Sequence, residues 1–107
     1  YPPIRRVPEL KPFQSQRIRV GAGEQVNYVI EPSRSRKYTI QTFGAMDTVM
    51  VLFEEIDGTP RYLEGDDDSG SSLNAKIRMR LFKGRRYIVR VRLYHAQEKG
   101  EGVLMMW

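Results

Sequence analysis

The chain is a series of short runs in which apolar and polar residues alternate, separated by turn-forming residues. Alternation with a period of two is typical of strands, whereas an amphipathic helix needs a period of 3.6 residues. No segment of twelve or more residues shows the helical period. The sequence therefore predicts an all-β chain, with strands at residues 17–20, 25–30, 37–43, 48–54, 59–63, 75–81, 86–94 and 102–107.

Seven or eight short strands at this spacing indicate an antiparallel β-sandwich, and a five-stranded barrel with longer loops is the alternative. The run at residues 48–54 is nearly all apolar, which predicts a central strand covered on both faces. Asp57-Gly58 predicts a turn. Because Pro60 has no amide donor, residues 59–63 are expected to form an edge strand.

The length of 107 residues is enough for one domain with a modest core. The absence of cysteine excludes disulfides, thiolate chemistry and cysteine-based zinc sites. No apolar run approaches the length that crosses a bilayer. Residues 1–16 contain four prolines, so we interpret them as a proline-rich linker that Ile4, Val7 and Leu10 lay against a domain at residues 17–107.

An acidic stretch, Asp66-Asp67-Asp68, precedes the last strands. Three adjacent carboxylates repel one another and cannot be buried unpaired, so this stretch is expected to be a loop. Oxygen ligands from Asp66, Asp68 and Asn74 suit Ca²⁺, and Asp47 adds a carboxylate if the two loops lie at the same end. The alternative is a turn in which these side chains bond their own backbone.

Basic side chains alternate along two neighbouring runs, with Lys76, Arg78 and Arg80 on the first and Arg86, Arg90 and Arg92 on the second. If the turn at Lys83-Gly84 joins these runs as a hairpin, both rows lie on one surface. Such a surface either binds an anionic polymer or is neutralised by nearby acidic residues, for which the candidates are Glu54, Glu55 and Glu64.

Tyr62 and Tyr94 lie near strand ends and are the tyrosines expected to be exposed. The only histidine, His95, lies in a polar turn, and no nucleophile motif accompanies it. The sequence therefore predicts a protein that is not an enzyme. A nucleic-acid role is also disfavoured, because exposed aromatic residues are not interleaved with the basic rows.

Several of these motifs occur in the order found in a known family. They are Tyr38-Thr39-Ile40, Gly44, Asp47, Leu52, Asp66-Asp67-Asp68-Ser69-Gly70, Asn74-Ala75-Lys76-Ile77, Leu81, Gly84 and Tyr87-Ile88-Val89-Arg90-Val91. Over residues 17–107 the chain resembles the bacterial pre-peptidase C-terminal domain, a family similar to the collagen-binding domains of clostridial collagenases.

The resemblance implies a jelly-roll-like β-sandwich on a secreted bacterial hydrolase, usually a peptidase. Such domains are non-catalytic and aid secretion or anchor the enzyme to a polymeric substrate. Some relatives bind Ca²⁺, which adds Asp67 to the expected ligands Asp47, Asp66, Asp68 and Asn74. The collagen-binding relatives take calcium through an acidic N-terminal segment, whereas this segment is basic here. This departure counts against calcium control by the linker and against collagen as the ligand.

The resulting hypothesis is an extracellular, monomeric accessory module that binds a polymeric substrate, either protein or polysaccharide, or its parent catalytic domain. Its expected polymer contacts are Arg78, Arg80, Arg90, Arg92 and Tyr94. The alternatives are a carbohydrate-binding module that uses exposed tyrosines and a purely structural domain.

Overall fold

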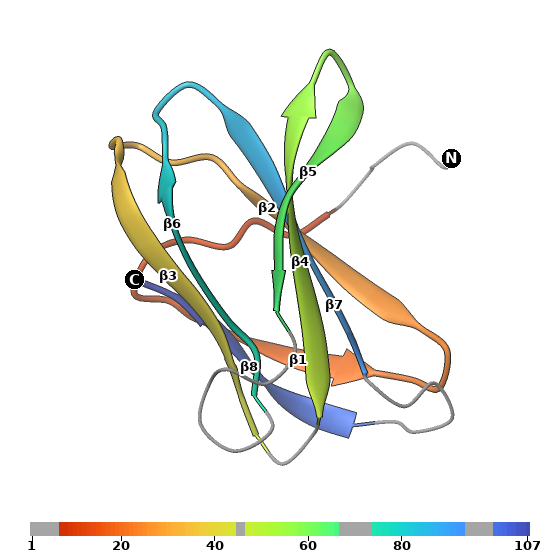
Figure 1. Cartoon of the computed structure of the whole chain (residues 1–107). Coiled ribbons are helices and arrows are strands. Elements are labelled where there is room, and N and C mark those ends of the chain that lie inside the picture. Colours follow the sequence, from red (N-terminus) through yellow and green to blue (C-terminus); the bar gives the residue numbers. More distant parts are fainter. Residues whose placement is uncertain (1–6, 45–46, 67–73, 94–99) are drawn as a thin grey trace.

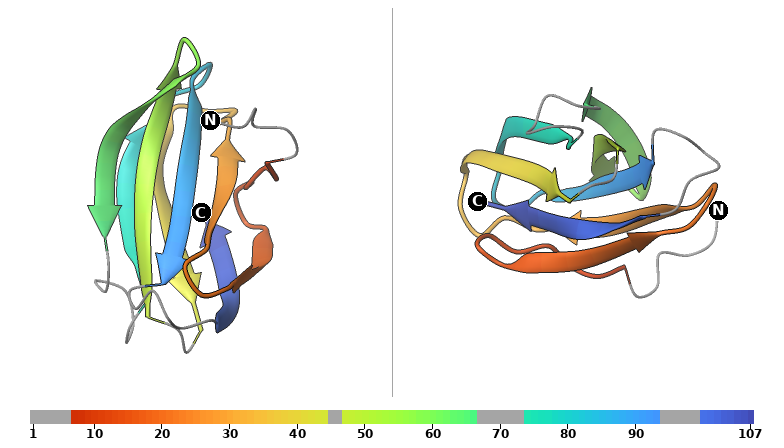
Figure 2. Two further views of the ribbon diagram at one scale, coloured as in Figure 1. Left: turned by 90° about the vertical axis from the view of Figure 1, so that its right-hand side faces the viewer. Right: turned by 90° about the horizontal axis from the view of Figure 1, so that it is seen from below.

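The structure is a computed structural model that describes residues 7–44, 47–66, 74–93 and 100–107. It contains eight strands in two four-stranded antiparallel sheets that pack face to face (Figures 1 and 2). The strands are β1 (Ser15–Val20), β2 (Gln25–Ile30), β3 (Arg36–Phe43), β4 (Thr48–Ile56), β5 (Thr59–Asp66), β6 (Lys76–Leu81), β7 (Arg86–Leu93) and β8 (Gly100–Met106). The prediction of an antiparallel β-sandwich is confirmed. In the described part of the chain, no helix is long and apolar enough to cross a membrane.

The strand orders, β1-β8-β3-β6 and β2-β7-β4-β5, are those of a jelly roll. β4 and β5 are the one pair of consecutive strands that are neighbours in the same sheet. They are joined through Asp57 and Gly58, whose φ angles of 51° and 77° match the two left-handed positions of a type I′ turn. The predicted turn is confirmed, and β5 lies at a sheet edge as Pro60 indicated.

The expected hairpin between β6 and β7 is wrong, because the two strands lie in different sheets. A tight turn joins them, in which the Arg85 amide donates to the Phe82 carbonyl at 3.3 Å. Leu81 ends β6 and Tyr87 follows near the start of β7, and both side chains are buried in the core between the sheets. A short turn therefore crosses from one layer to the other at this corner of the sandwich.

The expectation that β4 is covered on both faces is also wrong. β4 is a central strand between β7 and β5, but its burial alternates along the chain. Met50 and Leu52 are fully buried, whereas Val51 and Phe53 are half-buried on the outer face. The sandwich has two layers, so one face of each sheet covers the core and the other has no third layer over it.

The proline-containing segment before β1 contacts both sheets. The Leu10 amide donates to the Val29 carbonyl at 2.8 Å, and the Phe13 amide donates to the Met106 carbonyl at 2.7 Å. The segment therefore connects edge strand β2 of one sheet to β8 of the other (Figure 2). Leu10 is 1% exposed within the core, a burial that accords with its expected contact. The division into a linker and a domain at residue 17 stays a prediction.

Candidate functional site

A buried polar network ties three strand ends together at one end of the sandwich. The hydroxyl groups of Thr42 and Thr48 share a hydrogen bond of 2.7 Å. The Ala75 amide donates to the Thr42 hydroxyl at 2.9 Å and lies 3.2 Å from the Thr48 hydroxyl. The Thr42 amide donates back to the Ala75 carbonyl at 3.0 Å. Because every group in the network is buried, these bonds fix the end of β3 against the starts of β4 and β6.

This network brings two of the predicted calcium ligands to the same end of the molecule. Asp47 directly precedes Thr48, and Asn74 directly precedes Ala75, so the two residues flank a common cluster. Asn74 is 5% exposed. The backbone of Asp66 lies at this end as well, because Asp66 pairs with Met50 in the β4–β5 ladder.

The calcium prediction itself stays a prediction. Asp67, Asp68 and the side chain of Asp66 lie outside the described residues. Within the described ranges, no three His, Cys, Asp or Glu side chains gather closely enough to hold a metal ion.

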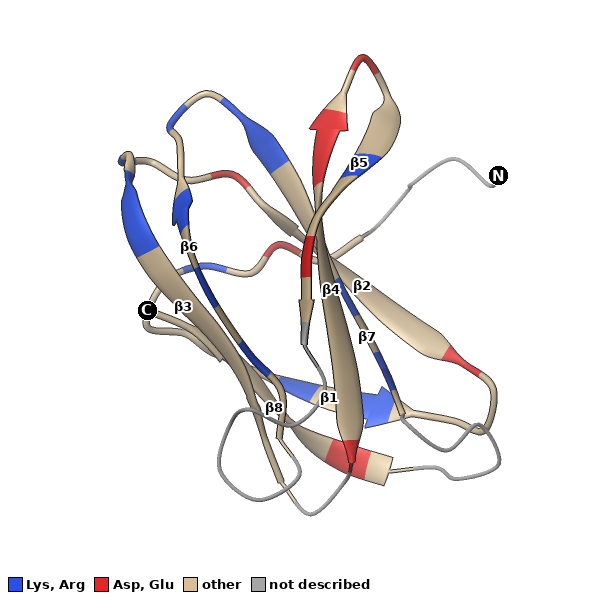
Figure 3. Cartoon of the chain, in the orientation of Figure 1, with Lys and Arg blue, Asp and Glu red and all other residues tan. Residues whose placement is uncertain are grey.

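Most of the cations at strand positions lie on the outer face of the β1-β8-β3-β6 sheet, as the burial patterns of its strands show. Figure 3 marks Lys and Arg along β1, β3 and β6 in blue. Its exposed cationic side chains are Arg17, Arg19, Lys37, Lys76, Arg78 and Arg80. Glu101 is the one acidic residue at the described outward strand positions, and it accepts a 2.7 Å hydrogen bond from Arg19. We refer to the outer surface formed by these seven residues, with Phe43, Val103, Met105 and Trp107 between them, as the basic face.

The centre of the basic face is apolar and aromatic. The rings of Phe43 and Trp107 lie 6.1 Å apart, centre to centre, with a tilt of 31°. An open depression of about 530 Å³ lies beside them and is lined by Arg17, Phe43, Gly44, Glu101, Gly102 and Val103. Glycine is favoured at position 44, because other residues rarely adopt its φ of 144° and a Cβ there would lie 3.1 Å from the Cα atom of Gly102. The cations of β1 and those of β6 therefore lie on either side of a strip that contains exposed ring surface.

On the outer face of the second sheet, Arg90 is held by contacts within the protein. Arg90 donates to Asn27 at 2.9 Å, and its guanidinium group lies 5.0 Å from the centre of the Phe53 ring. Phe53 in turn meets Tyr62 edge-on, with ring centres 6.5 Å apart. Tyr62 is 63% exposed, as the sequence predicted. This cluster presents one exposed ring beside a guanidinium group that already has partners.

Ion pairs neutralise the arginines at the β6–β7 turn. Arg86 lies 3.2 Å from Glu55, and Arg85 lies 3.7 Å from Glu54. The prediction that Glu54 and Glu55 neutralise arginines holds for this end of β7, while Glu64 takes part in no ion pair among the residues described.

The predicted polymer-binding residues do not form one surface. Arg78 and Arg80 lie on the basic face, whereas Arg90 and Arg92 lie on the opposite outer face, because β6 and β7 belong to different sheets. Tyr94 lies outside the described residues. Sequence reasoning missed the contribution of Arg17, Arg19 and Lys37. The alternation of β1 marks two of them as outward, but nothing local indicates that β1 and β6 share a sheet.

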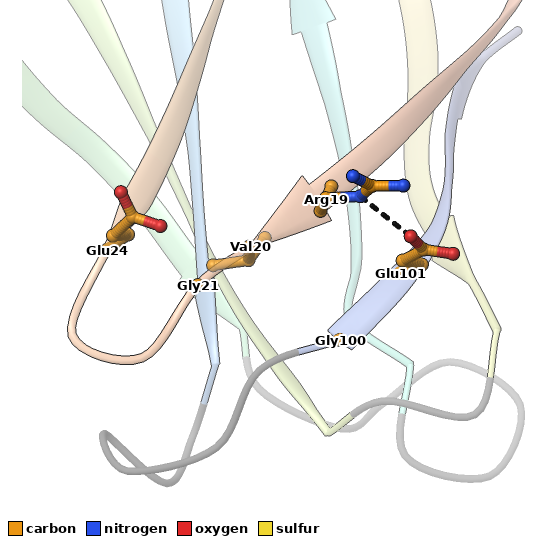
Figure 4. A pocket seen from close by; sticks show the side chains of 6 residues that line it. All are labelled: Arg19, Val20, Gly21, Glu24, Gly100 and Glu101. Atoms are coloured by element: carbon orange, nitrogen blue, oxygen red, sulfur yellow. Dashed lines mark hydrogen bonds and ion pairs between the residues drawn. The ribbon is translucent and has the colours of Figure 1, made fainter.

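A second depression, of about 630 Å³, lies at the turn between β1 and β2, beside the start of β8 (Figure 4). Its lining includes Arg19 and Glu101, which pair with each other, and Glu24, whose side chain extends from the turn. The carboxylate of Glu24 lies over Gly21, where any Cβ would collide with it. Among the residues that the structure describes, none of the predicted site residues lines this depression, and the described lining provides no nucleophile paired with a base.

Comparison with known proteins supports the fold. No protein-family model matches the sequence, and no curated protein matches it. The chain is similar to the crystal structure of the pre-peptidase C-terminal domain of collagenase from Bacillus anthracis, with a TM-score of 0.74 and 14% sequence identity. The match covers 94% of this chain and 93% of that domain. The chain therefore has the jelly-roll fold of a pre-peptidase C-terminal domain, as the resemblance implied.

Proposed function

We propose that this chain is a non-catalytic accessory module of a secreted bacterial hydrolase, a peptidase in particular, and that it holds the enzyme on a polymeric substrate outside the cell. The observation that carries the proposal is the match to the collagenase domain over nearly the whole of both chains. The sandwich also presents two broad outer faces with exposed basic and aromatic side chains, which suit contact with an extended polymer.

Co-sedimentation of the purified chain with an insoluble polymer tests this function. We expect the chain to sediment with insoluble collagen fibres or with an insoluble polysaccharide, and to release no product from either. In the parent hydrolase, deletion of the module should lower the rate on the insoluble substrate and leave hydrolysis of a short soluble peptide unchanged. An equal loss of rate on both substrates would contradict an anchoring role.

We further propose that Ca²⁺ stabilises the module at the end where Asp47, Asn74 and the backbone of Asp66 converge. Asp66, Asp67 and Asp68 complete the proposed ligand set. Carboxylate and amide oxygens are the donors that Ca²⁺ prefers, and the hydrogen-bonded network at Thr42, Thr48 and Ala75 supports a fixed position for two of them.

Calorimetric titration with CaCl₂, together with melting curves in CaCl₂ and in EDTA, tests the metal site. Saturating Ca²⁺ at about 100 times its Kd should stabilise the fold by about 2.7 kcal/mol and raise the Tm. Asp47→Asn should abolish much of this shift, whereas Asp57→Asn, in the exposed β4–β5 turn, should leave it intact. Identical melting curves in Ca²⁺ and EDTA would remove calcium from the proposal.

One observation favours carbohydrate binding as a second candidate function, namely the exposed ring of Tyr62 beside Phe53, Arg90 and Asn27. A ring exposed on one side can stack on the apolar face of a sugar. Binding of a soluble neutral glycan such as xyloglucan, insensitive to salt and lost in Tyr62→Ala, would support this candidate. Unchanged binding in Tyr62→Ala would contradict it.

A further inference from the structure

We propose that the basic face binds an acidic polysaccharide, meaning a glycan that carries sulfate or carboxylate groups along its length. The proposal rests on the proposed function, since it names the class of polymer and the surface that the accessory module uses. It is carried by the charge of this face, by the placement of its cations, and by the ring surface between them.

The charge of the basic face is strongly one-sided. Six exposed cations accompany one carboxylate, and that carboxylate is already paired with Arg19. Within the described part of the chain no ion pair involves Arg17, Lys37, Arg78 or Arg80. On the opposite outer face Arg86 is paired with Glu55 and Arg90 bonds to Asn27, so Arg92 is the one β7 arginine there that no ion pair or side-chain partner holds among the described residues. An anionic ligand is therefore expected to prefer the basic face.

The placement of the cations costs stability. Lys37 and Arg80 are direct cross-strand partners in the β3–β6 ladder, where like charges repel. Arg78, on the same face of β6, adds a third positive charge to this cluster. A surface with a purely structural role would be expected to place an acidic residue at one of these positions, as the second sheet does at Glu55. A bound anionic ligand would offset this repulsion, and the relief of the repulsion would add to the free energy of binding.

The geometry suits an extended chain more than a single ion. The strands β1 and β6, which carry these cations, are the two edges of a four-stranded sheet and lie about 14 Å apart at about 4.8 Å per strand. Between them lie Phe43, which is 37% exposed, and Trp107, which is half-buried. A polymer that crosses the strands can place acidic groups on both rows while its sugar rings cover the aromatic strip.

The basic face fits a single-stranded nucleic acid less well than it fits an acidic polysaccharide. Its bases need successive exposed rings on which to stack, interleaved with cations that follow the phosphates. Here Phe43 and Trp107 contact each other, and the basic rows lie on either side of them instead of between them. Thr39 and Gln41 are the outward residues between the rings and the cations of β6. Each is only 8% exposed, so neither leaves room for a base to stack there.

The test measures binding of the full chain to heparin, a sulfated and carboxylated polysaccharide, by calorimetry at several NaCl concentrations. Dextran is the uncharged control, and a single-stranded DNA oligonucleotide is the nucleic-acid control. The variant Arg78→Gln/Arg80→Gln removes two cations from the basic face. Its matched control, Arg61→Gln/Arg92→Gln, removes two exposed cations from strands of the other sheet. Melting curves verify that both variants fold. The heparin affinities of the single variants Arg78→Gln and Arg92→Gln are compared in the same way.

We expect heparin to bind and dextran not to bind. Arg78→Gln/Arg80→Gln should weaken heparin binding about tenfold or more and reduce the salt slope by about two, while the control pair changes the affinity by less than about threefold. Equal weakening by both pairs would overturn the proposal, since it would indicate attraction to net charge alone. Tighter binding of DNA than of heparin would also overturn it. A chain that sediments with insoluble collagen but ignores heparin would keep the proposed function and lose this inference.

Discussion

Tyr28 is a core side chain that carries an ionisable hydroxyl group. Burial raises the pKa of Tyr28 above 10.0, because the phenolate would lose its hydration. The folded state therefore holds this proton more tightly than the unfolded chain, so its contribution is complete below pH 10 and is lost as the pH rises through the folded pKa. Urea denaturation between pH 8 and pH 11 should show a smaller alkaline loss of stability in Tyr28→Phe than in the wild type. Parallel curves would contradict this role of burial.

Thr42 acts at the same scale, through a single buried hydroxyl group. Thr42→Val keeps the shape of the side chain but removes the nearer of the two acceptors of the Ala75 amide and the hydroxyl partner of Thr48. We expect a loss of about 1–3 kcal/mol in the free energy of unfolding, because a buried polar group loses its partner. Thr59→Val, at an exposed position of β5, is the control and should change stability by less than about 0.5 kcal/mol. Similar midpoints for the two variants would show that the network is not stabilising.

At the scale of elements, the segment before β1 contributes a core residue to the sandwich. Leu10→Ala should cost about 2–5 kcal/mol, the range found when a buried leucine leaves a cavity. The neighbouring Lys11 is exposed, so Lys11→Ala should have little effect in the same denaturation measurement. If the two variants unfolded at the same denaturant concentration, the segment would be a dispensable attachment.

The β6–β7 connection shows how an element can mislead sequence analysis. A two-residue turn between alternating runs is typical of a hairpin, and the residues around Lys83-Gly84 meet that description. Leu81 and Tyr87 point into the core from opposite layers instead. The choice between a hairpin and a corner depends on which strands already occupy the neighbouring positions, and this information is not local.

At the scale of the whole molecule, six exposed cations and one carboxylate share the basic face, so the charges on this face are expected to affect the stability of the fold. Arg80→Glu places a carboxylate directly opposite Lys37 and should stabilise the fold by about 0.2–1 kcal/mol at low salt. The gain should shrink in 1 M NaCl, where charges are screened beyond about 3 Å. Arg92→Glu makes the same change in net charge on the opposite face, where the cross-strand partners are Gln25 and Val49. Equal stabilisation by both variants would assign the effect to net charge instead of to the pair.

The sequence alone determined the all-β class, the approximate positions of the eight strands, the β4–β5 turn and the edge position of β5. These features depend on the period of two, on Asp57-Gly58 and on Pro60, all of which act over a few residues. The motif order also indicated the pre-peptidase C-terminal fold that the comparison supports. The alternation of the sequence also indicated which basic side chains point outward, but it did not indicate which of them are neighbours.

The tertiary structure decided the composition of each face. In a jelly roll nearly every connection passes from one sheet to the other, so residues that are close in sequence, such as Arg80 and Arg90, lie on opposite outer faces. Residues that are far apart in sequence, such as Arg17 and Arg78, share one face because β8 and β3 lie between their strands. The convergence of Asp47 and Asn74 likewise depends on long-range hydrogen bonds at Thr42, Thr48 and Ala75. Strand order is set by the burial of the whole core, and no single run of residues encodes it.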